Sequence, residues 1–200
     1  MGNKSIMKNA MKIILGSSSK PRQEILKNLG YEFEIVKPEV DEKAIRCEDP
    51  KELVLKIANA KADDVINKVS GDAIVIASDS ITIVNGEIRE KPQDKKQAYE
   101  WIREISKGVP QTQISSVVVV NTKTGKRLEG VDEASAIFNP IPERDAKEFV
   151  ESGTVFNHAG AYAIQNPNFK PYIKNINGEM ETIMGLPKKL TVQFLDNMKK

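Results

Sequence analysis

Short apolar runs and amphipathic stretches alternate along the first part of the chain. Apolar runs at residues 12–15, 33–36 and 72–77 predict three strands, and the last is apolar enough for the centre of a sheet. Apolar positions recur at helical spacing over residues 22–29 and in a longer stretch that begins at Pro50. Strands that alternate with helices in this way predict an α/β fold.

The second part of the chain favours strands joined as hairpins. Asn85-Gly86 is a hairpin turn signal, and residues 114–120 and 128–138 predict two antiparallel strands. Further elements are expected, in order, as a helix over 94–106, a helix over 143–152, a strand near 172–176 and a last helix after Pro187. The predicted class is α/β, with a mixed twisted sheet flanked by helices and two lobes around a central cleft.

Composition and charge narrow the class of protein. The 200 residues are 40% hydrophobic and 29% charged, which is typical of a globular protein with a substantial core. The 30 basic and 28 acidic residues give a formal net charge of +2, which argues against a nucleic-acid partner. The single cysteine, Cys47, excludes an internal disulfide, and the single histidine, His158, excludes a multi-histidine metal centre.

No apolar run in the sequence is long enough to span a membrane, and the first residues lack the apolar core of a signal peptide. We therefore expect a cytoplasmic protein without a membrane partner. Residues 1–10 are expected to form a loose N-terminal extension, and residues 11–200 a single domain.

Three consecutive serines stand between the first strand and the first helix. Ser17, Ser18 or Ser19 is expected to cap the helix, with Pro21 in its first turn. The same position also suits an anion, because the N–H groups at a helix N-terminus are unpaired and its dipole end is positive. A guanidinium close behind, Arg22, favours a phosphate site, so both interpretations stay open at this point.

Four more polar side chains differ from their surroundings. Asp79 interrupts an apolar strand, Lys61 lies beside core-facing alanines, Lys91 follows the hairpin, and Gln165 ends an apolar segment. Each has an ordinary explanation: a strand-end carboxylate, a lysine with a buried stem, a loop charge and a turn residue. Together they supply cations for phosphates, a carboxylate for a divalent ion and an amide for a base edge, which nucleotide chemistry requires.

Seven short motifs, in order along nearly the whole chain from Met11, resemble the Maf family. They are Ser17-x-Ser19-x-x-Arg22-x-x-Ile25-Leu26, Val40-Asp41-Glu42, Ala60-Lys61-Ala62, Ser78-Asp79-Ser80, Gly86-x-x-x-x-Lys91-Pro92, Ala159-Gly160-Ala161-Tyr162-x-x-Gln165 and Gly185-Leu186-Pro187. The resemblance implies a single Maf-like domain with a fold related to inosine triphosphate pyrophosphatases. It also implies hydrolysis of a nucleoside triphosphate between its α- and β-phosphates, with a divalent metal, Mg²⁺ or Mn²⁺. Maf proteins often form homodimers, and the resemblance allows for a homodimer here.

The resemblance also assigns roles to individual residues. Asp79, Lys61 and Lys91 would be catalytic, with Asp79 binding the metal or activating the attacking water. Glu42 would be a second metal ligand. The phosphate oxygens would be held by Ser17, Ser19 and Arg22, and the base pocket would be lined by Gln165.

Several positions depart from the usual pattern of the family. Only the second of two arginines after the serines is kept, in Lys20-Pro21-Arg22. A frequent histidine aligns with Gln111, and Glu179–Thr182 replaces a Ser-Tyr-x-Asn stretch. These departures indicate altered substrate preference or weaker activity.

Different motifs resemble branches of the family that act on different substrates. The segment from Ala161 to Gln165 resembles the branch that acts on dTTP and UTP, whereas Ser78-Asp79 is similar to the branch that acts on 7-methyl-GTP. We expect dTTP, UTP and modified or non-canonical nucleotides. The alternatives are an inosine or xanthosine triphosphate pyrophosphatase and a catalytically weak nucleotide-binding regulator of cell division.

Overall fold

The computed structural model describes residues 11–198, and one eight-stranded mixed sheet forms its centre. The predicted loose extension, residues 1–10, lies outside the described residues. The strands are β1 (Lys12–Gly16), β2 (Glu34–Ile35), β3 (Ala73–Ala77), β4 (Ser80–Val84), β5 (Glu87–Arg89), β6 (Gln111–Asn121), β7 (Arg127–Phe138) and β8 (Ile173–Asn177). Their main order is β2-β1-β3-β6-β4-β5, while β7 pairs with both β6 and β8. Because β1 pairs in parallel with β2 and β3 and the remaining pairs are antiparallel, the predicted mixed α/β class is confirmed.

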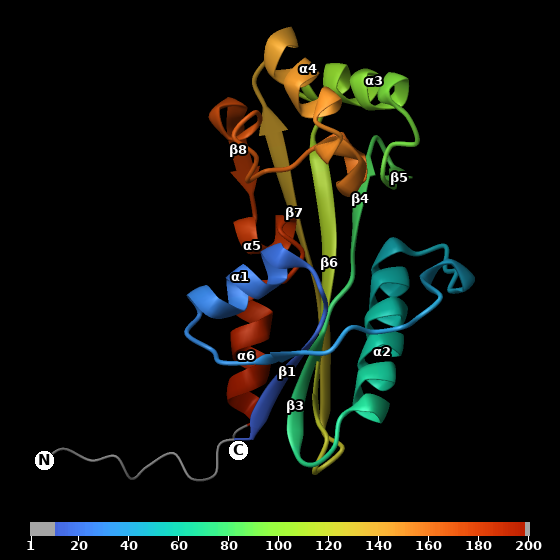
Figure 1. The fold of residues 1–200 in the computed structure, drawn as a ribbon, viewed down its shortest axis with the longest axis vertical. Helices are drawn as coiled ribbons and strands as arrows, with labels where there is room; N and C mark the ends of the chain where they lie inside the picture. Colours follow the sequence, from blue (N-terminus) through green and yellow to red (C-terminus); the bar gives the residue numbers. More distant parts are fainter. Residues whose placement is uncertain (1–10, 199–200) are drawn as a thin grey trace, which may run out of the picture.

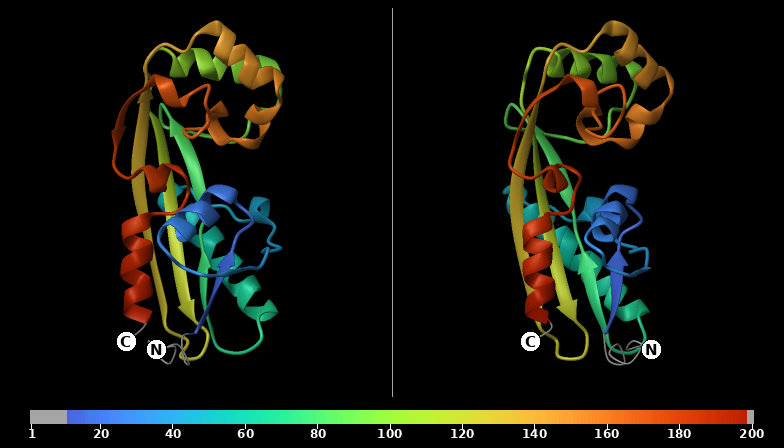
Figure 2. Two further views of the ribbon diagram at one scale, coloured as in Figure 1. Left: turned by 60° about the vertical axis from the view of Figure 1, so that its left-hand side comes forward. Right: turned by 90° about the vertical axis from the view of Figure 1, so that its left-hand side faces the viewer.

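Helices cover both faces of the sheet at one end and gather on one side at the other (Figure 1, Figure 2). They are α1 (Lys20–Asn28), α2 (Pro50–Lys68), α3 (Lys95–Ile105), α4 (Glu143–Glu151), α5 (Met180–Ile183) and α6 (Lys188–Met198). Short 3₁₀ turns are η1 (Glu42–Ala44), η2 (Thr154–Asn157), η3 (Ala159–Ala161) and η4 (Lys170–Tyr172). Aspartate side chains are the N-caps of two helices. Asp49 accepts hydrogen bonds from backbone N–H groups in the first turn of α2, and Asp94 accepts one from the first turn of α3.

The lower lobe contains β1, β3, part of β6 and helices α1, α2 and α6. Its sheet is buried on both faces. Successive residues of a strand point to opposite sides, so Ile76 and Val119 pack toward α1 and α6, while Val75 and Val118 pack toward α2. Both faces therefore need apolar side chains, which explains the near-continuous apolar run that the sequence shows at residues 72–77.

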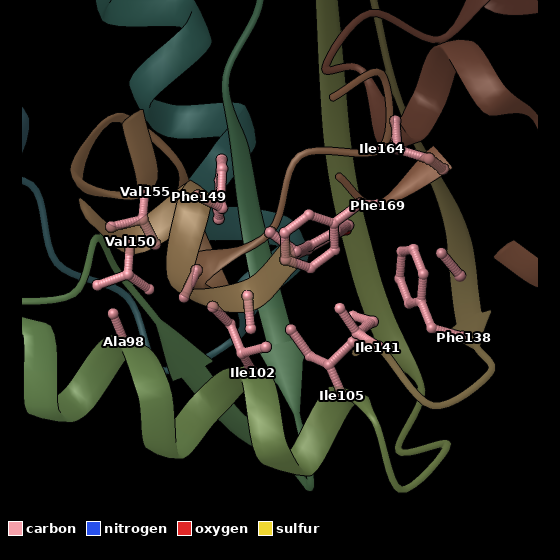
Figure 3. Packing of buried hydrophobic residues seen from close by; sticks show 14 of the residues in the cluster. Ala98, Ile102, Ile105, Phe138, Ile141, Phe149, Val150, Val155, Ile164 and Phe169 are labelled. Carbon is pink, nitrogen blue, oxygen red and sulfur yellow. The ribbon is translucent and has the colours of Figure 1, made fainter. Parts of the chain in front are cut away.

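The upper lobe has a separate core under α3 and α4 (Figure 3). The rings of Phe138, Phe149 and Phe169 meet edge to face, with centroids 5.9 Å apart for Phe138 and Phe169 and 4.8 Å apart for Phe149 and Phe169. Strands β6 and β7 run through both lobes, as the two turned views show (Figure 2). The two lobes are thus separate cores built on shared strands.

Strands β3 and β4 are two parts of one line of chain along β6. Ala77 pairs with Val118 and Ser80 with Ser115, so the register continues in step across the interruption at Ser78 and Asp79. The peptide N–H of Ser116 donates to the Asp79 carbonyl at 2.9 Å, and the backbone stays in the ladder. The interruption therefore places a carboxylate inside the sheet without a bulge.

Two elements differ from the expectation. The second strand is limited to two exposed residues, Glu34 and Ile35, because β2 is an edge strand that pairs only with β1 in the described structure. Helix α5 was not predicted, since four residues are too few to show a helical period. No helix within residues 11–198 is both long and apolar enough to cross a membrane.

Candidate active site

A cavity of about 630 Å³ lies between the two lobes, a size suited to a small-molecule ligand. Its wall is built from the β1–α1 turn, η1, α2, β4, β6 and the segment around η3. It brings together seven of the eight predicted site residues, namely Ser17, Ser19, Arg22, Glu42, Lys61, Lys91 and Gln165. The eighth, Asp79, joins this group through its contact with Lys61.

The serine turn faces the cavity without the expected side-chain cap. Ser19 occupies the N-cap position of α1, but in the described structure its hydroxyl makes no capping hydrogen bond. The Ser17 hydroxyl instead accepts from the Ser19 N–H at 3.2 Å and from Arg22 Nη1 at 3.4 Å. One of the three serines is therefore the N-cap residue, as expected, but its side chain makes no capping bond, and the first N–H groups of α1 remain available to a ligand.

Arg22 is a buried connector between three segments. Its Nε donates to the carbonyl of Gly185 at 2.8 Å, Nη1 to the carbonyl of Ser78 at 2.8 Å, and Nη2 to the Ser80 hydroxyl at 3.0 Å. Burial lowers the pKa of Arg22, and the nearby charge of Asp79 opposes this shift. Most of the guanidinium donors are thus used inside the protein, so Arg22 fixes the floor of the site besides lining it.

Lys61 and Asp79 form a buried ion pair at the base of the cavity. Lys61 Nζ lies 2.7 Å from Asp79 Oδ1 and 2.9 Å from Glu42 Oε1. Lys61 and Asp79 are each only 7% exposed, whereas Glu42 is exposed. Burial raises the pKa of Asp79 despite the opposing attraction of Lys61 and Arg22. A carboxylate whose pKa is raised in this way is suited to accept a proton.

The oxygen atoms of Glu42 and Asp79 converge on one ammonium group and suit a divalent cation. No cluster of three or more His, Cys, Asp or Glu side chains that could hold a metal occurs within residues 11–198. A Mg²⁺ ion is commonly held by one or two carboxylates together with substrate phosphates, so the donor set fits a metal that binds with a triphosphate.

Lys91 and Gln165 lie at the opposite wall, on exposed loops. Gln165 Nε2 is 3.5 Å from Glu24 Oε2, a long contact that leaves its amide weakly oriented. His158 lines the same wall, and its pKa is lowered by burial and by the charge of Lys91. This wall therefore supplies a cation and an adaptable amide.

Most residues that depart from the family pattern make contacts inside the protein and do not line the cavity. Gln111 is fully buried and donates to the Val109 carbonyl at 2.9 Å. Glu179 pairs with Lys189 at 3.0 Å, and the Thr182 hydroxyl donates to Asp132. The Glu179 pair joins the start of α5 to α6, and Thr182 joins α5 to β7. None of these three side chains lines the cavity. Pro21, by contrast, lines the cavity in the first turn of α1.

Among the cavity residues that were not singled out as site residues from the sequence, three stand out by their burial and polarity. Thr82 and Gln113 are buried polar side chains of β4 and β6, and the ring of Tyr162 lies beside them in the wall. Burial raises the pKa of Tyr162, whose hydroxyl has no hydrogen-bond partner among the described residues. The available signal was a polar residue in each of two neighbouring apolar strands, which acquires meaning only once their register is known.

Sequence comparisons with known proteins agree with the motifs. A family model described as "Maf-like protein" matches residues 12–198. A 7-methyl-GTP pyrophosphatase from Dictyostelium discoideum is 38% identical and covers 93% of this chain and 96% of its own length. A dTTP/UTP pyrophosphatase from Symbiobacterium thermophilum is 36% identical, with 92% of each chain covered. The structure of a HAM1 protein from Coxiella burnetii aligns with a TM-score of 0.47 and 11% identity over 94% of this chain and 98% of that one.

Proposed function

The chain belongs to the Maf family, and on this premise we propose that it is a nucleoside triphosphate pyrophosphatase. Water would add to the α-phosphorus, the bond to the bridging oxygen would break, and the products would be a nucleoside monophosphate and pyrophosphate. The observation that carries the proposal is the Lys61 ammonium between the carboxylates of Asp79 and Glu42 at the base of the cavity.

Asp79 is the proposed base for the attacking water. Its carboxylate is buried, and its raised pKa makes it a better proton acceptor than an exposed aspartate. Lys61, 2.7 Å away, would hold this carboxylate in place and offset charge that develops on the α-phosphate. Lys91, on the opposite wall, would offset charge on the leaving pyrophosphate.

The serine turn is the proposed phosphate cradle. Ser17 and Ser19 present hydroxyls beside the N-terminus of α1, where free N–H groups attract an anion. Lys20 is exposed in the same wall and adds a positive charge. Arg22 would act mainly by fixing the turn to Ser78 and Gly185, since most of its donors are used there.

Glu42 and Asp79 are the proposed ligands of a divalent metal, Mg²⁺ or Mn²⁺. When bound, such an ion would polarise the phosphoryl oxygens and lower the charge of the triphosphate. Lys61 would then share the two carboxylates with the ion, and the Glu42 side chain is exposed.

The proposed substrates are dTTP, UTP and modified or non-canonical nucleotides, which matches a role in removing unwanted nucleotides. The dTTP/UTP pyrophosphatases named among the relatives support this choice, while the Dictyostelium relative adds 7-methyl-GTP. The proposal includes a cytoplasmic location, where nucleoside triphosphates are made and used, and a homodimer.

The test is release of pyrophosphate from canonical, deaminated and methylated nucleoside triphosphates, with Mg²⁺, Mn²⁺ or a chelator. We expect metal-dependent release, highest with UTP or dTTP, that Asp79→Asn lowers by about a hundredfold or more. Asp72→Asn is the matched control, because Asp72 is exposed and pairs with Lys123 on the surface. Highest release from deaminated purines would favour an inosine triphosphate pyrophosphatase. Binding without release would favour a regulator.

A further inference from the structure

Thr82 and Gln113 form a buried polar pair in the cavity wall. They face each other across β4 and β6 as direct cross-strand partners, and the Thr82 hydroxyl donates to Gln113 Oε1 at 2.8 Å. Both residues line the cavity, yet Thr82 is only 1% exposed and Gln113 only 7%. Burying polar groups between apolar strands is unfavourable unless their hydrogen bonds are made, so this pair has a defined geometry.

The pair fixes which group Gln113 offers to a ligand. Because Oε1 is engaged by Thr82, the group that remains for a cavity ligand is the Nε2 amino group, a hydrogen-bond donor. Gly160 packs close to Thr82, since a Cβ atom added at Gly160 would lie 2.9 Å from Thr82 Cγ2. The amide is therefore oriented in advance, unlike the exposed amide of Gln165.

The pair also lies at the right place along β4. Ser80, next to Arg22 and the proposed phosphate cradle, and Thr82 are two residues apart on the same face of the strand. Two residues of a strand span about 7 Å, comparable with the ribose that separates the α-phosphate from the base. The cavity lining also includes apolar side chains that could pack on the flat face of a base, namely Tyr162, Ile164, Ile183 and Met184.

We propose that Gln113 reads the base of the nucleotide, and that Thr82 is the residue that positions it. The Nε2 group donates to a carbonyl oxygen on the base edge, so the site selects bases with a carbonyl there, such as uracil, thymine and guanine. Cytosine and adenine present an amino donor at the corresponding position and oppose the donor of Gln113. The inference rests on the proposed function and names the substrate class of the same site.

The test compares UTP with CTP, whose bases differ at C4, a carbonyl in uracil and an amino group in cytosine, and at N3, which carries a hydrogen only in uracil. The kcat/KM for each is measured, and binding of each is measured by calorimetry with the Asp79→Asn protein. We expect wild type to prefer UTP by about tenfold or more, the value of one oriented hydrogen bond, and Gln113→Leu to remove the preference. Gln113→Glu offers only acceptors and should shift the ratio further toward CTP.

Controls separate base reading from folding. Gln193→Leu makes the same change on the exposed face of α6 and should leave the ratio of UTP to CTP as in wild type. Thr82→Val lacks the hydroxyl and should lower the ratio, whereas Thr82→Ser keeps it and should preserve most of the ratio. If Gln113→Leu does not fold, the two Thr82 variants decide the question.

The outcomes are distinct. A folded Gln113→Leu protein with the wild-type ratio, or a wild type that uses UTP and CTP equally, would overturn the inference. If wild type releases no pyrophosphate from any nucleotide, the proposed function fails, but a binding preference for UTP that Gln113→Leu removes would still support base reading by Gln113.

Discussion

Lys61 and Asp79 are a buried ion pair in which each charge depends on the other, with 2.7 Å between Nζ and Oδ1. Lys61→Met leaves the Asp79 carboxylate without its main partner, and we expect the free energy of unfolding to fall by about 3 kcal/mol. The double variant Lys61→Met, Asp79→Asn removes both charges and should recover most of this loss. Urea titration measures both.

The control for this prediction is Lys68→Met, because Lys68 pairs with Asp64 near the surface at 2.8 Å. A more solvated pair contributes little, so the loss should be much smaller than in Lys61→Met. Equal losses in Lys61→Met and Lys68→Met would contradict the importance given to the buried pair.

Arg22 and Lys20 are neighbouring cations with different expected roles. A lysine at position 22 cannot reach the Gly185 carbonyl, the Ser78 carbonyl and the Ser80 hydroxyl together, so Arg22→Lys should lower the free energy of unfolding by about 2–3 kcal/mol. Lys20→Ala removes only an exposed charge, and should raise KM about fivefold with an unchanged melting temperature. The reverse pattern would make Arg22 a pure ligand of the phosphates.

Gly160 is expected to be required both for its positive φ angle and for the lack of space beside Thr82. Alanine variants of Gly160 and Gly153 can separate these two effects. At Gly153, with φ of +74° and open space around the Cβ position, alanine should cost about 1–2 kcal/mol from backbone strain alone. At Gly160, with φ of +70°, the added Cβ also meets Thr82 Cγ2, and we expect a further loss of about 1–3 kcal/mol. Thermal unfolding gives both values, and equal losses would show that the turn is not pressed against Thr82.

Tyr172 and Asp145 give a pH-dependent contribution to stability. The Tyr172 hydroxyl donates to Asp145 and lowers the pKa of that carboxyl below its usual value of about 3.9. A lowered pKa means that the stabilisation is present above the unfolded pKa and is lost as pH falls through the folded one. Tyr172→Phe should therefore lower the melting temperature near neutral pH, with a difference that shrinks in acid.

The background variant Asp145→Asn checks the cause of this pH dependence. With no titrating group at position 145, Tyr172→Phe should change the melting temperature by an amount that does not vary with pH. A difference that still shrinks in acid would assign the effect to another group.

Much of the fold could be predicted because its signals are local. The apolar run 72–77, the helix opened by Pro50 and the hairpin turn at Asn85-Gly86 depend on neighbouring residues, and each occurs as expected. Asn85 and Gly86 have positive φ values of 52° and 82°, as this hairpin turn requires. Short elements such as α5 could not be predicted, because four residues carry no period.

The site could be predicted less completely because its contacts are remote in sequence. The motifs identified segments that do meet at one cavity. The roles of Asp79, Lys61 and Lys91 stay predictions. The use of Arg22 as a connector could not be foreseen, since Gly185 lies 163 residues away from it in the chain. The pairing of Thr82 with Gln113 likewise depends on strand register, which one sequence does not reveal.

Strands β6 and β7 pass through both lobes, and this has a mechanical consequence (Figure 2). Moving the lobes together over a ligand would require the continuous ribbon of β6 and β7 to bend. The hydrogen bonds between the two strands would be distorted with it. Such a ribbon has no hinge between the lobes. It resists bending, and it favours a return to its original shape. The shape of β6 and β7 therefore sets the width of the cavity between the lobes.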